Sequence, residues 1–411
     1  MKILVVLPRF PYPLEKGDKL RAYHQLRMLA RRNEIYLFCL SHDDVADEAI
    51  AAVKPFCKEV EVTRIPRLTA YKNVVRNFFG CKSLQLGYWD ARSARKVYKQ
   101  MERRVRPDVI YSQMVRTMPM VARSEVPKVM DFQDALSMNA ERRMAEAKGL
   151  KHFVLHFEFK MLRSTEYNAF SFFDGLTIIS EPDSEAIPHR KNGTIAIVPN
   201  GVDIDYYQPQ PDARKNYDVV FCGNMQYEPN VVASKYLVEQ VMPLVWQRFP
   251  EAQVLLAGAS PKRSVKALAG ERVTVSGWVD DMRQSYAHSR VFVAPMQLGS
   301  GLQNKLLEAM AMGLPCVTTD IANASLGAAE GSEILVGTCA QQLADHIASL
   351  LGSEERRNTL AQNGLNFVRN TYSWEAFGDK LEQVLAEAAS KPSKVSLYEG
   401  KKIVPEGGKQ R

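Results

Sequence analysis

The sequence predicts an α/β protein built from two doubly wound, Rossmann-like domains. At 411 residues the chain is too long for one ordinary domain. Short apolar runs alternate with helical stretches in the first half, and the same alternation restarts near residue 217. A hydrophobic content of 46% and a charged content of 24% are typical of a globular protein.

The first half opens with a continuous apolar run over residues 3–7, as expected for a strand buried in a parallel sheet. A loop over residues 8–18 leads to an amphipathic helix, and residues 35–40 form the next strand. The Gly-x-Gly-x-x-Gly fingerprint is missing from this unit, so it does not predict a dinucleotide site.

Two further strands are expected over residues 107–112 and 127–132, followed by a long helical region over residues 140–173. Asp134 follows the second of these strands, at a carboxyl end where open α/β sheets bind ligands. We expect Asp134 to contact a sugar, and a turn-forming aspartate without chemistry is the alternative.

The second half contains strands over residues 217–223, 253–258, 273–279 and 290–295. The last is followed by a glycine turn and then by a helix from about Gln303. Lys305 and Glu308 are three residues apart, so they share a face near the helix N-terminus, where unpaired N–H groups favour anions. Such a site can hold an anion with the lysine and hydroxyl groups with the glutamate, or it is an ordinary solvated pair.

Two motifs carry a resemblance to a known family. Residues 301–315 read Gly-x-x-x-Lys-x-Leu-Glu-Ala-Met-Ala-x-Gly-x-Pro, and residues 199–203 read Pro-Asn-Gly-Val-Asp. Both resemble segments of retaining GT-B glycosyltransferases, glycosyltransferase family four (group one), including sugar transferases of bacterial exopolysaccharide clusters. The resemblance implies the GT-B fold, in which two doubly wound domains face one another across a cleft.

The same resemblance implies roles for particular residues. Lys305 would bind the diphosphate of a nucleotide sugar, Glu308 the ribose hydroxyls, and Asp134 the reacting sugar. Trp278 would border the base, although core packing explains a tryptophan equally well. Ser300 stands where many members have a glutamate. The residues expected to line the donor site are Gly17, Asn200, Gly201, Gly223, Asn224, Trp278, Val279, Gly299, Ser300, Gly301, Leu302, Gln303 and Asn304.

The expected domain boundaries follow from these motifs. Residues 1–195 would form the acceptor-side domain and residues 196–372 the nucleotide-sugar domain. Residues 373–389 would form a helix that crosses back onto the first domain. Residues 390–411 are rich in lysine, glycine and proline and are expected to be disordered.

The predicted function is retaining transfer of a sugar from a nucleotide-diphosphate donor to a glycan or polyprenyl-linked acceptor, in exopolysaccharide or cell-surface polysaccharide synthesis. Neither a metal nor another cofactor is expected, because helix amides and a lysine can stabilise the leaving diphosphate. Two alternatives stay open: a nucleotide-sugar epimerase of the same fold and a non-catalytic, membrane-associated scaffold. The pair His152 and His156 lacks the glutamate of a zinc-protease motif.

The charge of +8 is concentrated between residues 61 and 106, where basic residues alternate with aromatic ones. This stretch is a candidate for contact with anionic lipid, and a solvated helix face explains it equally well. No nucleic-acid-binding module is visible, so no nucleic-acid partner is expected. The six cysteines are scattered and the first residues do not form a signal peptide, so a cytoplasmic protein, with or without peripheral attachment to the inner membrane, is predicted.

Overall fold

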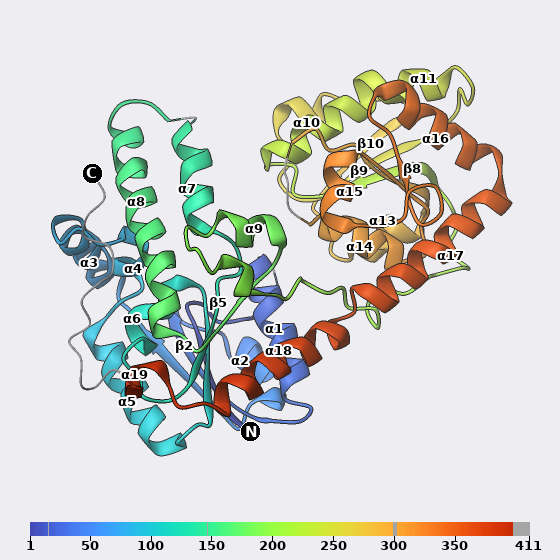
Figure 1. The fold of residues 1–411 in the computed structure, drawn as a ribbon. Helices are drawn as coiled ribbons and strands as arrows, with labels where there is room; N and C mark the ends of the chain where they lie inside the picture. Colours follow the sequence, from blue (N-terminus) through green and yellow to red (C-terminus); the bar gives the residue numbers. More distant parts are fainter. Residues whose placement is uncertain (15, 146, 299–301, 398–411) are drawn as a thin grey trace. The chain divides into compact units, whose positions relative to one another are not determined.

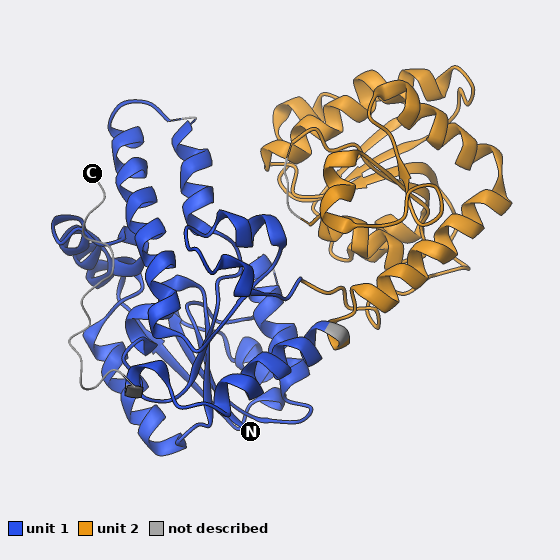
Figure 2. Ribbon diagram, in the orientation of Figure 1, with its two compact units in different colours: residues 1–199, 377–411 blue, residues 200–376 orange. Residues whose placement is uncertain are grey.

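The computed structural model describes residues 1–397 except for 15, 146 and 299–301. The chain forms two compact units (Figure 2): unit 1 comprises Met1–Pro199 and Phe377–Arg411, and unit 2 comprises Asn200–Ala376. Each unit contains one parallel sheet with helices against it (Figure 1). The predicted α/β class with two doubly wound halves is therefore confirmed.

The sheet of unit 1 has seven strands in the order β3-β2-β1-β4-β5-β6-β7, and all neighbours are parallel. The chain builds one side outward from β1 and then the other side outward from β4, so the strand order reverses between β1 and β4. The strands are β1 (Lys2–Leu7), β2 (Glu34–Ser41), β3 (Glu59–Arg64), β4 (Val109–Gln113), β5 (Lys128–Asp131), β6 (Gly175–Ile178) and β7 (Ala196–Ile197).

Alternate residues of these strands supply two cores, one on each face of the sheet. Leu4 and Val6 belong to one hydrophobic cluster, whereas Ile3, Val5 and Leu7 belong to the other. The helices that cover the sheet or extend from it are α1 (Gly17–Leu29), α2 (Asp47–Val53), α3 (Arg67–Phe79), α4 (Leu84–Tyr88), α5 (Arg92–Val105), α6 (Met118–Val121), α7 (Leu136–Ala145), α8 (Gly149–Phe172) and α9 (Glu181–Ala186).

A buried ion pair ties α1 to β5. Arg21 Nε donates to Asp131 Oδ2 at 2.7 Å, and both side chains are fully buried. Tyr111 and Thr177 also donate to the Asp131 carboxylate, at 2.9 and 3.0 Å. Burial alone raises the pKa of Asp131, but the Arg21 charge and these hydrogen bonds outweigh it and lower the pKa below its usual value. The loop before α1 and the loop after β5 are thereby held in a fixed relation.

The sheet of unit 2 has six parallel strands in the order β10-β9-β8-β11-β12-β13, so its order reverses between β8 and β11. The strands are β8 (Tyr217–Cys222), β9 (Val254–Ala257), β10 (Val273–Gly277), β11 (Ser289–Ala294), β12 (Cys316–Thr318) and β13 (Leu335–Val336). The α-helices of this unit are α10 (Glu228–Tyr236), α11 (Met242–Trp246), α12 (Arg263–Lys266), α13 (Met282–Ala287), α14 (Asn304–Ala311), α15 (Asp320–Leu326), α16 (Ala340–Gly352) and α17 (Glu354–Thr371).

The division between the units lies a few residues from the expected position. Residues 196 and 197 form β7, which pairs with β6, so this segment belongs to the first sheet and not to the second unit. The helix expected over residues 373–389 is α18 (Trp374–Ala389), which starts in unit 2 and continues in unit 1. Its Leu381 and Leu385 are fully buried in a core cluster of unit 1.

Two further expectations need correction. The helical region over residues 140–173 is divided into α7 and α8, which pack together (Figure 1); α8 begins at Gly149 with a positive φ of 60°. The disorder expected over residues 390–411 does not include α19 (Lys394–Leu397). The backbone N–H of Lys394 donates to Asp174 at 2.7 Å, and its ammonium group donates to Phe170 O at 3.1 Å, so polar contacts attach this segment.

Among the described residues, no helix combines the length and the hydropathy required to span a bilayer.

Candidate functional sites in the two units

In unit 2 the strand order reverses between β8 and β11, so these two strands lie side by side. In open α/β sheets the crevice at such a point, at the carboxyl ends of the strands, is the usual ligand site. β8 runs into Gly223 and α10, and the neighbouring β11 leads through the predicted glycine turn into α14. A Cβ atom on Gly258, after β9, would lie 1.9 Å from the carbonyl oxygen of Gly223, so backbone meets backbone here.

Lys305, in the first turn of α14, reaches across to α10. Its ammonium group donates to Asn230 Oδ1 and lies 4.7 Å from the centre of the Phe221 ring. Within the described part of the chain, no carboxylate lies within ion-pair distance of this ammonium. Burial lowers the pKa of Lys305 to about 8. The lysine is thus positioned by a neutral amide, and the charge of Glu308 acts on it only from beyond ion-pair distance.

Glu308 lies one turn further along α14. Tyr286 donates to Glu308 Oε2 at 2.7 Å, and Tyr207 also hydrogen bonds to the carboxyl group. Burial raises the pKa of Glu308 to about 7. Neutral hydroxyl groups therefore hold this carboxylate, just as a neutral amide holds Lys305.

Sequence reasoning identified Lys305 and Glu308 but missed the residues that hold them. Asn230 is 75 positions from Lys305, and Tyr286 is 22 positions from Glu308. Asn230 also donates to the carbonyl oxygen of Asn224 at 2.9 Å. No spacing rule links such distant positions: the pairing of β8 with β11 brings α10, which carries Asn230, close to α14, and Tyr286 and Glu308 lie on the two helices that flank β11.

The other expected donor-site residues of unit 2 are placed as follows. Gly223 and Asn224 lie beside Asn230, in the same turn. Trp278 is 71% exposed and donates to Asp280 at 2.9 Å, so the alternative of core packing is wrong. Val279 is half-buried next to it. Leu302, Gln303 and Asn304 lead into α14, whereas Gly299, Ser300 and Gly301 lie outside the described residues.

Asn200 and Gly201 lie at the first positions of unit 2, beside the start of α18. A Cβ atom on Gly201 would lie 2.7 Å from the backbone nitrogen of Trp374. Close packing at this joint therefore explains the glycine without a ligand.

Unit 1 has its own cavity at the corresponding reversal of strand order, with a volume of about 530 Å³. Gly17 and Asp134 both line it, so the two candidate residues of this unit are brought together. Segments after β1, β4 and β5 contribute to the wall. The polar lining consists of Arg9, Asp18, Gln85, Arg116, Gln133, Asp134, Asn139, Arg143 and Glu158.

Asp134 is oriented by one neutral donor. Asn139 Nδ2 donates to Asp134 Oδ2 at 2.7 Å, whereas the buried Oδ1 has no hydrogen-bond partner among the described residues. Burial, together with the charge of Asp183, raises the pKa of Asp134 to about 6. The preceding residue, Gln133, has a positive φ of 68°, a backbone strain that is common in binding loops. Asp134 is thus a half-buried residue in the wall of the cavity.

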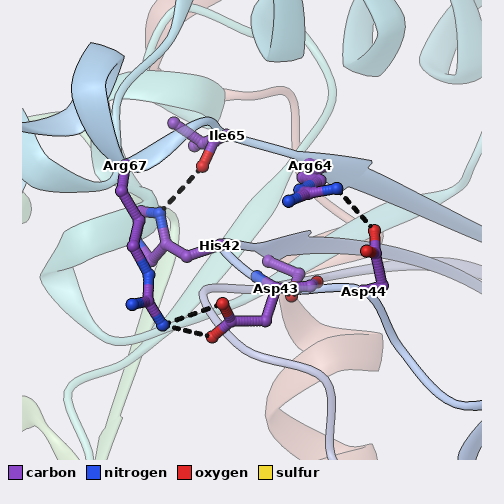
Figure 3. Close-up of polar contacts among 7 residues, drawn as sticks. His42, Asp43, Asp44, Arg64, Ile65 and Arg67 are labelled. Atoms are coloured by element: carbon purple, nitrogen blue, oxygen red, sulfur yellow. Dashed lines mark hydrogen bonds and ion pairs between the residues drawn. The ribbon is translucent and has the colours of Figure 1, made fainter.

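A second hollow of about 450 Å³ adjoins the first at Arg9. Arg67 of this hollow donates through Nη2 to both oxygens of Asp43 at 2.8 and 2.9 Å, and the nearby Arg64 donates to Asp44 at 2.8 Å (Figure 3). His42 Nδ1 donates to the carbonyl oxygen of Ile65 at 3.0 Å. The arginines of this hollow therefore already have anionic partners.

In the described part of the chain, no group of three or more histidine, cysteine, aspartate or glutamate side chains is arranged to hold a metal ion.

Comparison with known proteins identifies the second unit. Residues 216–353, which include Lys305 and Glu308, match the family model for glycosyl transferases group 1. The chain contains a group 1 glycosyl transferase domain. The site built by β8, β11, α10 and α14 lies inside this domain.

Curated relatives extend the comparison beyond the domain. A phosphatidyl-myo-inositol mannosyltransferase of Mycobacterium leprae is 28% identical over 211 residues, which cover 49% of this chain and 55% of the relative. The chain thus spans little more than half of that protein. An uncharacterised 44.6 kDa protein in the cps region of Klebsiella pneumoniae is 20% identical over 383 residues, covering 90% of this chain and 96% of the relative.

Solved structures resemble the whole chain. Sucrose-phosphate synthase from Thermosynechococcus elongatus aligns with a TM-score of 0.66 at 15% identity, covering 95% of this chain and 100% of the other. Anabaena HepE in complex with UDP aligns with a TM-score of 0.64 at 17% identity, covering 94% and 100%. The protein has the GT-B fold, as predicted.

Proposed function

We propose that this protein is a retaining glycosyltransferase that uses a nucleotide-diphosphate sugar. The observation that carries the proposal is the arrangement of Lys305 and Glu308 on one face of α14, each held by a neutral partner. A diphosphate would supply the negative charge that Lys305 lacks, and the ribose hydroxyls would donate to Glu308. The complex of Anabaena HepE with UDP supports a nucleotide ligand for this fold.

In the proposed reaction the bond between the anomeric carbon and the β-phosphate oxygen breaks, and the acceptor oxygen forms the new glycosidic bond. The acceptor proton passes to the leaving phosphate oxygen on the same face, which preserves the configuration. Negative charge develops on the diphosphate, and Lys305 together with the N-terminal amides of α14 stabilises it. These groups supply the charge stabilisation for which other transferases employ a metal ion.

The acceptor is proposed to be a glycan or a polyprenyl-linked sugar of cell-surface polysaccharide synthesis. The relative from a cps region supports this setting, and the Mycobacterium leprae mannosyltransferase is named for a lipid substrate. The cavity of unit 1 with Gly17 and Asp134 would receive the acceptor.

A thermal-shift screen with uridine, guanosine and adenosine diphosphates and their sugars, with and without EDTA, tests the donor site. We expect one nucleotide series to raise the melting temperature, to do so in EDTA, and to lose its effect in Glu308→Ala. The product of the matching sugar transfer should retain the anomeric configuration, as read by NMR. No shift with any nucleotide would contradict the proposal and favour a non-catalytic scaffold.

Helix α3 supports peripheral contact with a membrane, because it buries polar side chains and exposes apolar ones. It buries Asn73 and Asn77, which donate to the carbonyl oxygens of Asp90 at 2.6 Å and Ser83 at 2.8 Å. Its solvent face instead carries large apolar residues that are 56–81% exposed, namely Leu68, Tyr71, Val75 and Phe79. Exposed apolar side chains within the basic segment 61–106 suit an anionic lipid surface.

We expect the double variant Leu68→Ser and Phe79→Ser to lose at least half of the binding to vesicles that contain anionic lipid. Sedimentation with these vesicles measures the bound fraction. Ile321→Ser, which removes an exposed apolar residue of unit 2, is the matched control and should bind as the wild type does. Equal binding by both variants would show that α3 is not the contact.

A further inference from the structure

The cavity of unit 1 contains an arginine whose charge no carboxylate neutralises. Arg116 donates through Nε and Nη2 to Gln85 Oε1 at 3.0 and 2.7 Å, and Nη1 meets only Met114 Sδ at 3.6 Å. Among the described residues no carboxylate lies within ion-pair distance of its guanidinium group. Burial and the nearby Arg9 charge lower the pKa of Arg116, and they outweigh the charges of Asp18, Asp134 and Glu158, which act in the opposite direction from beyond ion-pair distance.

The carboxylates of the same cavity are already occupied by protein donors. Asp18 accepts from Arg9 at 2.8 Å. Glu158 accepts from Ser83 Oγ at 2.7 Å and from the backbone N–H of Leu84 at 2.7 Å, so it caps α4. Neither carboxylate is therefore available to Arg116.

A third arginine widens the positive region. Arg143, on α7, lines the cavity and has no carboxylate within ion-pair distance in the part of the chain that the structure describes. Its side chain is exposed, so it can move toward a bound anion. In the adjoining hollow, by contrast, Arg67 is paired with Asp43 (Figure 3).

Hydrogen-bond acceptors without a partner lie in the segment that follows β5, on the wall of the same cavity. Asp134 Oδ1 and Gln133 Oε1 are buried acceptors without a hydrogen-bond partner among the described residues. A buried acceptor left unsatisfied costs free energy, which a ligand hydroxyl would recover after a side-chain rotation that turns the oxygen into the cavity. The cavity thus combines unused cationic donors with unused acceptors, at a volume of about 530 Å³ that is sufficient for a sugar-sized ligand.

We propose that this cavity binds a hydroxylated ring that carries an anionic group, either a phosphate ester or a carboxylate. Arg116 and Arg143 would pair with the anion, and Asp134 and Gln133 would accept hydrogen bonds from the ring hydroxyls. The proposal rests on the proposed glycosyl transfer for its place in the reaction, because this ring would be the acceptor or the part of it next to the reacting hydroxyl. The acceptor is then an acidic sugar or a sugar phosphate, and not a neutral glycan.

Direct binding to the full chain tests this without a transfer assay. Glucose, glucuronate, glucose 1-phosphate and inorganic phosphate are titrated and followed by ligand-observed NMR. We expect glucuronate or glucose 1-phosphate to bind about tenfold more tightly than glucose, because a charge-assisted contact is added. The better of the two identifies the anion. Arg116→Gln should abolish the difference, and Arg116→Lys should keep part of it.

Arg123→Gln is the matched control, since Arg123 is an exposed arginine of the same unit outside the cavity. Asp134→Asn should weaken glucose 1-phosphate but not inorganic phosphate, because only the ring contacts Asp134. Equal affinity for glucose and both anionic sugars, no saturable binding of either, or an unchanged preference in folded Arg116→Gln would overturn the proposal. Nucleotide binding to unit 2 is measured in the same samples: its absence would reject the transfer reaction, whereas the sugar titrations judge the cavity separately.

Discussion

Two buried combinations of a cation and a carboxylate show opposite arrangements in the two units. Arg21 and Asp131 in unit 1 contact one another directly, are fully buried, and complete their hydrogen bonds inside the protein. Lys305 and Glu308 in unit 2 share a helix face, and each hydrogen bonds to a neutral side chain, Asn230 and Tyr286 respectively. The first pair ties α1 to β5, and we propose that the second pair binds a ligand.

The pKa directions express the same difference. Contact with Arg21 lowers the pKa of Asp131, so its charged form is favoured in the folded protein. Burial raises the pKa of Glu308 to about 7 and lowers the pKa of Lys305 to about 8, so the charged form of each side chain is disfavoured in the folded protein. The charged form of Asp131 therefore adds to the stability of the folded protein, whereas the charged forms of Glu308 and Lys305 reduce it. Charged groups that reduce stability in this way are typical of binding sites.

The largest expected effect comes from breaking the structural tie. Asp131→Asn removes the charged partner that contacts the fully buried Arg21 and should lower the free energy of unfolding by about 3–5 kcal/mol. Urea denaturation measures it. Asp379→Asn removes an exposed partner of Arg32 and should cost less than about 1 kcal/mol. Similar losses in the two variants would mean that the buried pair contributes no more than a surface pair.

Removing the unpaired cation should affect activity and not stability. Lys305→Met is expected to lower sugar transfer about 100-fold, as for other groups that stabilise developing charge. The melting temperature should stay level or rise, because an ammonium with no anionic partner is no longer buried. Lys262→Met, which removes an exposed lysine paired with Glu228, is the control for transfer. A large loss of stability in Lys305→Met would show that this lysine, like Arg21, has a structural role.

The carboxylate of the same site should show a smaller effect on activity. Glu308→Gln keeps an acceptor for Tyr286 but loses the charge, so we expect transfer to fall about tenfold. Since the folded-state pKa of about 7 lies above the ordinary value of 4.5, the stability that protonated Glu308 contributes to the apo protein is lost as the pH rises from about 4.5 to about 7. The variant should therefore melt higher than the wild type at pH 8 and equally at pH 4. A lower melting temperature at pH 8 would contradict this.

The smallest effect is on the pH dependence. If transfer needs ionised Glu308 and protonated Lys305, kcat/KM for the donor should fall a few-fold below about pH 7 and above about pH 8. Glu308→Gln should lose the acid limb, and Lys305→Met the alkaline limb. Identical pH profiles of kcat/KM in the wild type and both variants would show that other groups cause the falls at low and high pH.

Local patterns in the sequence were enough for much of the fold. Continuous apolar strands such as residues 3–7 and the three-residue spacing of Lys305 and Glu308 depend only on neighbours in the chain. The partners Asn230 and Tyr286 could not be predicted, because the sheet brings them in from distant positions.

Contacts between distant positions also explain why the expected domain boundary and the expected disordered tail were wrong. Residues 196 and 197 looked like the start of the second domain because no local signal shows that they pair with β6. The segment around Lys394 has the composition of a disordered tail, but its contact with Asp174 spans 220 positions. In unit 1, Gly17 and Asp134 were separate candidates, and only the cavity relates them to Arg116.

Proton uptake on nucleotide binding tests most directly whether the ammonium group of Lys305 pairs with a bound diphosphate. The identified nucleoside diphosphate is titrated calorimetrically at pH 8 in EDTA, in two buffers of different ionisation enthalpy. With a free-protein pKa of about 8, Lys305 is half-protonated at this pH, and a bound diphosphate should raise its pKa and draw in about half a proton. We expect this uptake in the wild type and not in Lys305→Met. Binding without uptake, or the same uptake in both proteins, would show that the diphosphate does not contact Lys305.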